Sequence, residues 1–225
     1  MADSKISALT ALAGADIATA TDVLPIVDTS VTTTKKTTID DLGTSLGATQ
    51  AEVNAMTSTN TLLTPAINKI VLGTEQASTS GTSIDFTGIP AGVRRIKIHF
   101  VGVSTNGTSN ILVQLGDAGG IENTNYVGGA NSSSGASTGT NSAGFIVMLN
   151  VLATNTMSGQ VVLDLEDSTD FTWTQNANLI SADALVFTNS AGYKSLSAEL
   201  TQLRVTAANG TDTFDAGAIN ISYER

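Results

Sequence analysis

The side chains that could carry out catalysis are few in this chain. His99 is the only histidine among 225 residues, so a Ser-His-Asp site would have to use it. The run 95–100 alternates polar and apolar residues, which predicts a strand with His99 and Lys97 on its polar face. Cysteine is absent, and this excludes thiol catalysis, thiolate metal sites and disulfides. The sequence therefore predicts that the protein is not an enzyme.

A cluster of carboxylates is the second place where chemistry could occur. Its members are Asp164, Glu166, Asp167 and Asp170. Such oxygen ligands can hold Ca²⁺, but their spacing is not that of an EF-hand loop, and a solvated turn is the simpler interpretation. Glycoside hydrolysis needs two carboxylates that face each other across a sugar, and no motif fixes such a pair. We expect neither a metal nor a cofactor, with calcium binding by these residues as the alternative.

Two aromatic residues are candidates for ligand contact. Trp173 is the only tryptophan, and Phe171 lies two residues before it, so both rings share one face of a predicted strand. Such rings can stack against a sugar, although a tryptophan in the core is the interpretation that we favour. Tyr126 lies near the start of a Gly-, Ser- and Asn-rich stretch, 123–142, which predicts a long polar loop. Tyr126 and Trp173 are the candidate contacts.

The elements that must hold these residues are mainly β-strands. The chain has 21 Gly and 3 Pro, and 13% of its residues are charged, against roughly 25% in typical soluble domains. From Ser83 onward, apolar residues alternate with polar ones between Gly, Asn and Ser turns. The predicted strands are 84–86, 95–100, 111–115, 145–152, 160–166, 185–188, 196–205 and 218–223. About eight strands of this kind favour a jelly-roll-like β-sandwich.

The front of the chain differs, because it contains no aromatic residue before Phe86. Two β-prone runs, 23–27 and 34–39, predict a hairpin. Pro25 restricts the first run to an edge or an extended arm, since proline cannot donate a ladder hydrogen bond. We expect this small extended segment to hide its apolar residues against a larger partner.

The stretch 47–68 predicts a neck of short helices. Thr49 and Glu52 have the spacing of a capping box, and Pro65 suits a first helical turn. Helices this short are not stable alone, so packing between copies of the chain must hold them. The apolar residues expected at that interface are Val53, Leu63, Ile67 and Ile70. Residues 73–81 then predict a linker.

The net charge of the chain limits its partners. A charge of −10 and a pI near 4.3 argue against nucleic acid and against an anionic membrane surface. The N-terminal residues contain no continuous apolar run of the signal-peptide type, and no stretch approaches the length of a membrane span. Neither nucleic acid nor a membrane is therefore expected as a partner.

Several passages resemble bacteriophage tail-fibre and related virion proteins. Residues 48–67, ATQAEVNAMTSTNTLLTPAI, are similar to a stretch in which ATxAEVxAGT leads into VTP, although Met56 replaces the usual glycine. Upstream, SKISALTAL and ADIATATDVLPIVDTSVTTTKKTTIDDL resemble the start of many phage structural proteins. The passages IDFTGIPAGVRRIKIHFVGVSTNGTSNILVQLGD and FDAGAINISYE are similar to a β-domain at the ends of such proteins. Residues 123–216 carry little resemblance.

The resemblance implies a virion protein with three parts: an anchor (1–42), a helical trimerisation neck and linker (43–82), and a β-sandwich head (83–225). It implies a homotrimer attached by its N-terminus to tail, baseplate or capsid proteins. The anchor residues would be Leu24, Ile26, Val27 and Ile39. The expected function is a tail fibre or receptor-binding appendage, with host surface glycan as a ligand and Tyr126 and Trp173 as receptor contacts. A head fibre or capsid decoration protein is the alternative.

Overall fold

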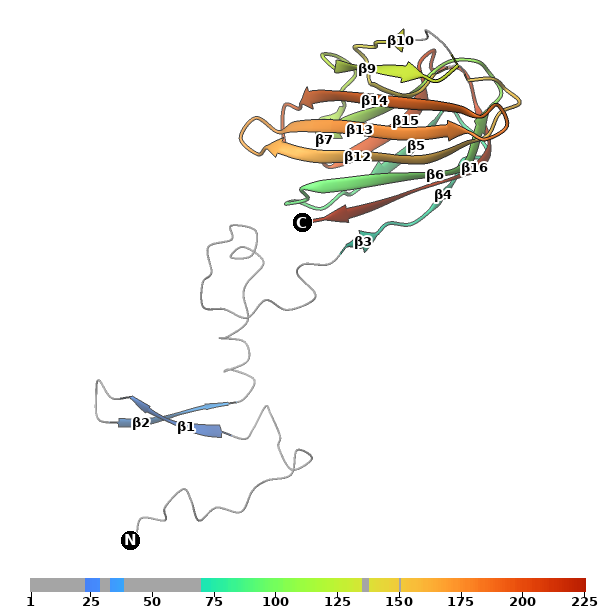
Figure 1. Cartoon of the computed structure of the whole chain (residues 1–225). Coiled ribbons are helices and arrows are strands. Elements are labelled where there is room, and N and C mark those ends of the chain that lie inside the picture. Colours follow the sequence, from blue (N-terminus) through green and yellow to red (C-terminus); the bar gives the residue numbers. More distant parts are fainter. Residues whose placement is uncertain (1–22, 29–32, 39–69, 135–137, 150) are drawn as a thin grey trace. The chain divides into compact units, whose positions relative to one another are not determined.

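The computed structural model describes residues 23–28, 33–38, 70–134, 138–149 and 151–225. The chain forms two compact units, Met1–Asn68 and Lys69–Arg225. In the first unit, β1 (Val23–Asp28) and β2 (Thr33–Thr38) form an antiparallel hairpin (Figure 1). The hairpin confirms the two β-prone runs, and a sheet of two strands leaves Pro25 on an edge, as proline requires.

The second unit contains a large antiparallel sheet, whose strands β12, β13 and β14 lie side by side in Figure 1. The strand order is β10-β9-β14-β13-β12-β6-β16-β3, and β4 also pairs with β16. The strands of this sheet are β3 (Val71–Leu72), β4 (Gln76–Ala77), β6 (Arg95–Thr105), β9 (Val127–Ser132), β10 (Thr138–Gly139), β12 (Met157–Asp167), β13 (Thr172–Ser181), β14 (Val186–Ser195) and β16 (Phe214–Glu224).

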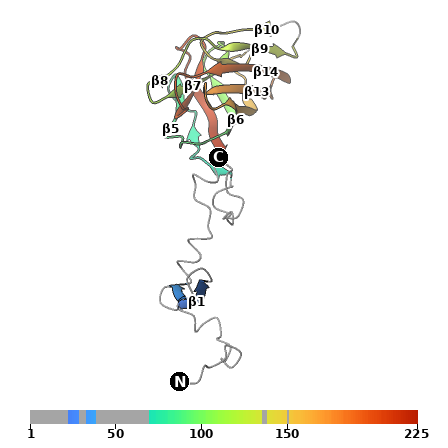
Figure 2. The ribbon, with the colours of Figure 1, turned by 90° about the vertical axis from the view of Figure 1, so that its left-hand side faces the viewer.

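A smaller antiparallel sheet has the order β11-β7-β15-β5, and β8 pairs with β7. Its strands are β5 (Ser83–Thr87), β7 (Ile111–Asp117), β8 (Gly120–Ile121), β11 (Phe145–Met148) and β15 (Gln202–Ala207). In Figure 2, β7 and β8 lie to the left of β13 and β14. Side chains from both sheets enter one apolar core. Two antiparallel layers around one core are consistent with the predicted β-sandwich.

Alternation along the strands separates the core from an outward face. In β6, Ile96 and Ile98 are 0% exposed and Phe100 is 2% exposed, whereas the residues between them are partly exposed. This confirms the predicted register, with His99 on the outer face. The same period of two runs through β13 and β14. The larger sheet therefore presents one continuous face away from the core.

Several stretches differ from the expected organisation. The strand expected at 196–205 begins only at Gln202, in β15. The predicted loop 123–142 contains β9 and β10. The sequence did not predict these strands, because the Gly- and Asn-rich segment carries few of the large apolar residues that mark a strand. The predicted linker 73–81 contains β4, which pairs with β16, so the strands of the second unit begin before residue 83. Strand β13 extends well beyond the Phe171–Trp173 pair on which a strand was expected.

No helix occurs among the described residues, and none there is therefore long and apolar enough to cross a membrane. The neck predicted at 47–68 lies outside the described residues.

Candidate functional site

Tyr126 lies in the core instead of on an exposed loop. It is 5% exposed, and its hydroxyl accepts a hydrogen bond from the Leu115 amide (2.6 Å) and donates to the Glu122 carbonyl (2.9 Å). Its ring packs edge-on against Phe145, with 4.9 Å between the ring centroids. Burial raises the pKa of its hydroxyl. The expected exposed contact by Tyr126 is therefore wrong, because the loop assumed around it contains strands.

A buried ion pair lies beside Tyr126. Lys194 on β14 has a side chain only 3% exposed, and its ammonium group pairs with the Glu122 carboxylate and donates to the Ser195 carbonyl. The ammonium nitrogen lies 5.6 Å from the centroid of the Tyr126 ring. Glu122 also accepts a hydrogen bond of 2.8 Å from the Ser197 amide. These contacts satisfy a charge inside the sandwich and indicate a structural role.

Trp173 also belongs to the core, at 2% exposure, so its ring is not an exposed contact either. Phe171 precedes β13 with a φ of 49°, and this positive φ breaks the alternation that was expected to place both rings on one strand face. Both rings line a cavity of about 130 Å³ together with Arg94 and Glu199. This cavity is smaller than typical ligand pockets, which are roughly 300–1,000 Å³.

Of the four acidic residues between 164 and 170, Asp164 and Asp167 accept hydrogen bonds from different groups. Asp164 accepts a hydrogen bond of 2.6 Å from Arg95, and Asp167 accepts one of 2.6 Å from the Thr169 amide within its own turn. The Thr169 hydrogen bond also lowers the pKa of Asp167. In the described part of the chain, no group of three or more His, Asp or Glu side chains is arranged to hold a metal ion.

His99 lies on the outer face of β6, as the sequence predicts. Its Nε2 is 3.1 Å from Ser222 Oγ on the neighbouring strand β16. No described carboxylate is hydrogen-bonded to His99, so the third member of a Ser-His-Asp arrangement does not occur among the described residues.

Half of the predicted assembly residues fall outside the described part of the chain. Val53, Leu63, Ile67 and Ile39 lie outside the described residues. Leu24, Ile26 and Val27 belong to β1, where they pair with Thr37, Lys35 and Thr34 respectively. Ile70 is described and is 63% exposed, and Leu72 on β3 is 67% exposed. Two apolar side chains are therefore exposed where the second unit begins.

The outer face of the larger sheet carries a row of polar side chains that sequence reasoning missed. Directly opposed residues on neighbouring strands connect β9, β14, β13, β12, β6 and β16. In that order, the row consists of Asn131, Asn189, Asn178, Gln160, His99 and Asn220. Five are carboxamides and one is an imidazole, and we call these six residues the amide row. Five steps of about 4.8 Å between strands give a length of about 24 Å.

Much of the hydrogen-bonding capacity of the amide row is unused. Asn178 Nδ2 donates weakly to Asn176 Oδ1 (3.4 Å), and Asn220 Oδ1 accepts from the Ile221 amide (2.8 Å). The side chains of Asn131, Asn189 and Gln160 form no hydrogen bond with any described residue, and all three residues are exposed. Each free carboxamide offers two N–H donors and an acceptor oxygen.

A hollow of about 550 Å³ lies along one end of the amide row, over β9, β13 and β14. It is a shallow, open depression of the sheet face, not an enclosed cavity. Three amide-row residues line it, and the outward positions next to them hold Gly129 and Ala191, which pair with each other. Because these two residues carry little or no side chain, the face is recessed there.

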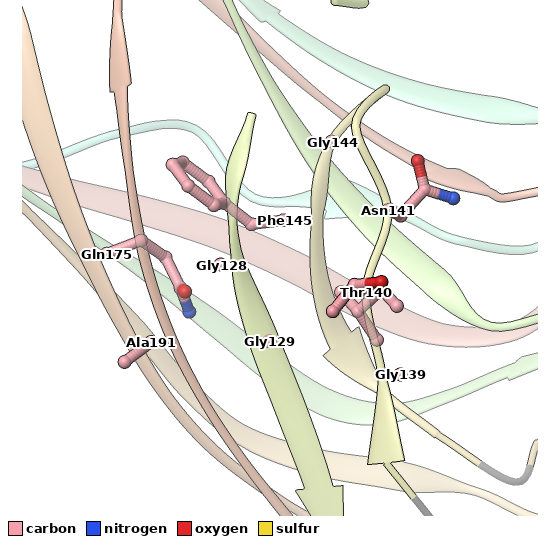
Figure 3. A pocket seen from close by; sticks show the side chains of 10 residues that line it. Gly128, Gly129, Gly139, Thr140, Asn141, Gly144, Phe145, Gln175 and Ala191 are labelled. Carbon is pink, nitrogen blue, oxygen red and sulfur yellow. The ribbon is translucent and has the colours of Figure 1, made fainter. Parts of the chain in front are cut away.

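Gln175 has an unsatisfied acceptor on the inner face of β13, the side opposite the amide row. It is 4% exposed, and its Nε2 donates to Ser190 Oγ at 3.0 Å, while its Oε1 has no partner among the described residues. Its amide end points into a small cavity near Gly128 and Gly129 (Figure 3). This cavity of about 10 Å³ has the size for one water molecule, and it shares four lining residues with the hollow.

Exposed aromatic rings lie on the same face. Phe187 is 53% and Tyr193 is 48% exposed, and they are the most exposed aromatic residues in the described ranges. Both lie on β14, two and four residues from Asn189, so they point to the same side as the amide row. The outward positions of β14 therefore carry, in order, an aromatic, an amide, a small and an aromatic side chain.

Together, these residues form a surface that can bind a ligand without reacting with it. The amide row supplies neutral donors and acceptors, and the β14 rings supply apolar area. In sequence, the signals were the alternating asparagines of TQNAN and the TNSAGY segment, which had no assigned strand partners until the register was known. No protein-family model, curated protein or solved structure matches the chain.

Proposed function

We propose that the chain is a trimeric, non-enzymatic appendage of a bacteriophage virion that binds the host surface. The N-terminal unit anchors it to the particle, and the β-sandwich unit presents the binding surface. The observation that supports the proposal is a β-sandwich with an open polar face in a chain whose N-terminal passages resemble those of virion proteins. The proposal places the protein in the virion and assigns it no cofactor.

The finer architecture belongs to the same proposal. We expect jelly-roll-like connections in the sandwich and short helices at 47–68 that bring three copies together. The exposed Ile70 and Leu72 support this, since apolar side chains next to the neck would be covered in an assembled trimer. In a trimer, binding at one site raises the effective concentration of the other two sites at the host surface, so three weak sites give a strong attachment.

Trimerisation is tested by light scattering on the full chain. We expect a mass of three chains, and we expect the Ile67→Asp variant to lose it, because a charge would be buried in the apolar seam. A monomeric wild-type chain, or a variant trimer as robust as wild type, would contradict this part of the proposal.

The location is tested by gold labelling of intact particles with an antibody against the β-sandwich. Label at the tail or baseplate is the expected result. Label on the capsid would instead indicate the head-fibre alternative. Absence of the protein from purified particles, checked by mass spectrometry, would refute the virion proposal altogether.

A further inference from the structure

We infer, resting on the proposed function and deepening it, that the outer face of the larger sheet binds a neutral oligosaccharide along the amide row. The ligand would lie over β9, β14 and β13, in the hollow floored by Gly129 and Ala191. This site differs from the exposed-loop and Trp173 contacts expected from the sequence. The ligand class follows from three properties of the face: its hydrogen-bonding groups, its charge and its aromatic rings.

The hydrogen-bonding groups match a polyhydroxylated ligand. Every sugar hydroxyl is both donor and acceptor, and a carboxamide presents both functions at one end. Asn131, Asn189 and Gln160 have both functions unused among the described residues, and the amides repeat at the strand spacing of about 4.8 Å. A regular row of such groups suits a chain of repeating hydroxyl-bearing units.

The charge distribution favours a neutral ligand over an acidic one. The part of the amide row that borders the hollow consists of Asn131, Asn178 and Asn189, none of which carries a charge. The charged residues of the face are displaced toward β6 and β12, where Arg95 is already paired with Asp164. No residue lining the hollow could form an ion pair with a carboxylate or sulfate group.

The aromatic rings supply the apolar half of sugar recognition. Sugar rings expose C–H faces that pack on aromatic faces, and Tyr193 and Phe187 lie on β14 at the two sides of Asn189. Along β14, Phe187 lies two residues, about 7 Å, from Asn189, and Tyr193 lies four residues, about 13 Å, on its other side. Because the amide row crosses the strands, a ligand that follows the row would contact Phe187, the ring nearer to Asn189.

The test is binding of the full-length chain to an array of neutral and acidic oligosaccharides, followed by calorimetric titration of the best neutral one. We expect binding to neutral members and at least a tenfold weaker affinity for the Asn178→Ala/Asn189→Ala double variant. Asn123→Ala is the matched control, since Asn123 is exposed but lies off the sheet face, and it should bind as wild type does. Phe187→Ala, at the exposed ring nearer to Asn189, provides a second variant, which should also weaken binding.

Thermal unfolding of each variant separates loss of binding from loss of folding. All substituted residues are exposed or half-exposed, so we expect midpoints close to wild type. The inference would be overturned if the chain bound only acidic oligosaccharides or bound no neutral one. It would also be overturned if both folded variants kept the wild-type affinity. Self-association of the second unit through this face, abolished by the double variant, would show that another copy covers it and would also overturn the inference.

The outcome is independent of the particle-labelling experiment. A chain found on virions that binds no neutral oligosaccharide would overturn the site and leave the proposed function in place. A chain that binds such a ligand but is absent from virions would do the reverse.

Discussion

Lys194 shows how one residue can be indispensable to this fold without being part of its binding surface. The side chains of β14 alternate between the two faces of the sheet, and that of Lys194 points inward. Burial of a lysine is unfavourable unless its charge is paired. Glu122, from the segment after β8, supplies the partner, and the Tyr126 ring lies beside the ammonium group. The pair therefore connects the two sheets through side chains more than 70 residues apart in sequence.

Replacing Lys194 with Met should destabilise the protein by about 3–5 kcal/mol, because the Glu122 carboxylate would remain largely buried without its cation. Lys97→Met is the control, since Lys97 is on the outer face and should change stability by only about 0.5 kcal/mol. Urea denaturation of both variants measures the difference. Equal losses would show that the ion pair does not have the role assigned here.

The same pair gives the protein a specific sensitivity to acid. Burial raises the pKa of Glu122, but hydrogen bonds from Lys194 and Ser197 outweigh it, so the pKa lies below the ordinary 4.5. A depressed carboxyl pKa contributes stability that is complete above the ordinary value and is lost as the pH falls below it. Stability should therefore decrease below pH 4.5, and Glu122→Gln should flatten this decrease. An unchanged pH profile in that variant would refute the assignment.

At the scale of elements, alternation made much of the fold predictable. The pattern RIKIHF showed both the strand and its register, because large apolar residues alternate there with charged ones. It failed at VGGANS, where glycine and alanine carry no such signal, although β9 pairs with β14 over six residues. It also left the asparagines of β13 unexplained. Their significance depends on which strands are neighbours, and that is long-range information.

The bulge in β16 depends on one glycine. Gly217 has a φ of 86°, and a Cβ at this position would lie 2.4 Å from the backbone of Gly102 on β6. Gly217→Ala should therefore cost about 2 kcal/mol or more, since a left-handed conformation alone costs roughly 1–2 kcal/mol for a residue with a Cβ. Gly88→Ala is the control, with a φ of 72° and no atom within 4 Å of the added carbon. Similar unfolding free energies for the two variants would contradict the steric account.

At the scale of the whole molecule, the chain consists of a sandwich that should fold alone and an N-terminal unit that should serve assembly. The sandwich includes the segment before residue 83. Ser78, at 0% exposure, donates from its hydroxyl to the Ala216 carbonyl (2.8 Å) and from its amide to Gly217 (2.9 Å). Gly73 donates to Ile221 at 2.7 Å.

A fragment of residues 69–225 should therefore fold cooperatively. Three more hydrogen bonds join this segment to the sandwich, through the carbonyls of Gly81 and Thr82 and the side chain of Gln76. A fragment of 83–225 should therefore be less stable by about 6 kcal/mol, at roughly 1 kcal/mol for each lost hydrogen bond. Thermal and chemical denaturation of the two fragments decide the point. A fragment 83–225 as stable as 69–225 would show that β3 and β4 are mere attachments to the sheet edge.

For the whole molecule, we propose that the chain attaches a phage to its host through the outer face of the larger sheet. The most direct measurement is the adsorption of intact phage to host cells in the presence of excess purified full-length chain. We expect the wild-type chain to compete and lower adsorption, and the folded Asn178→Ala/Asn189→Ala variant not to. Adsorption that is unchanged by the wild-type chain, or lowered equally by the variant, would contradict the claim.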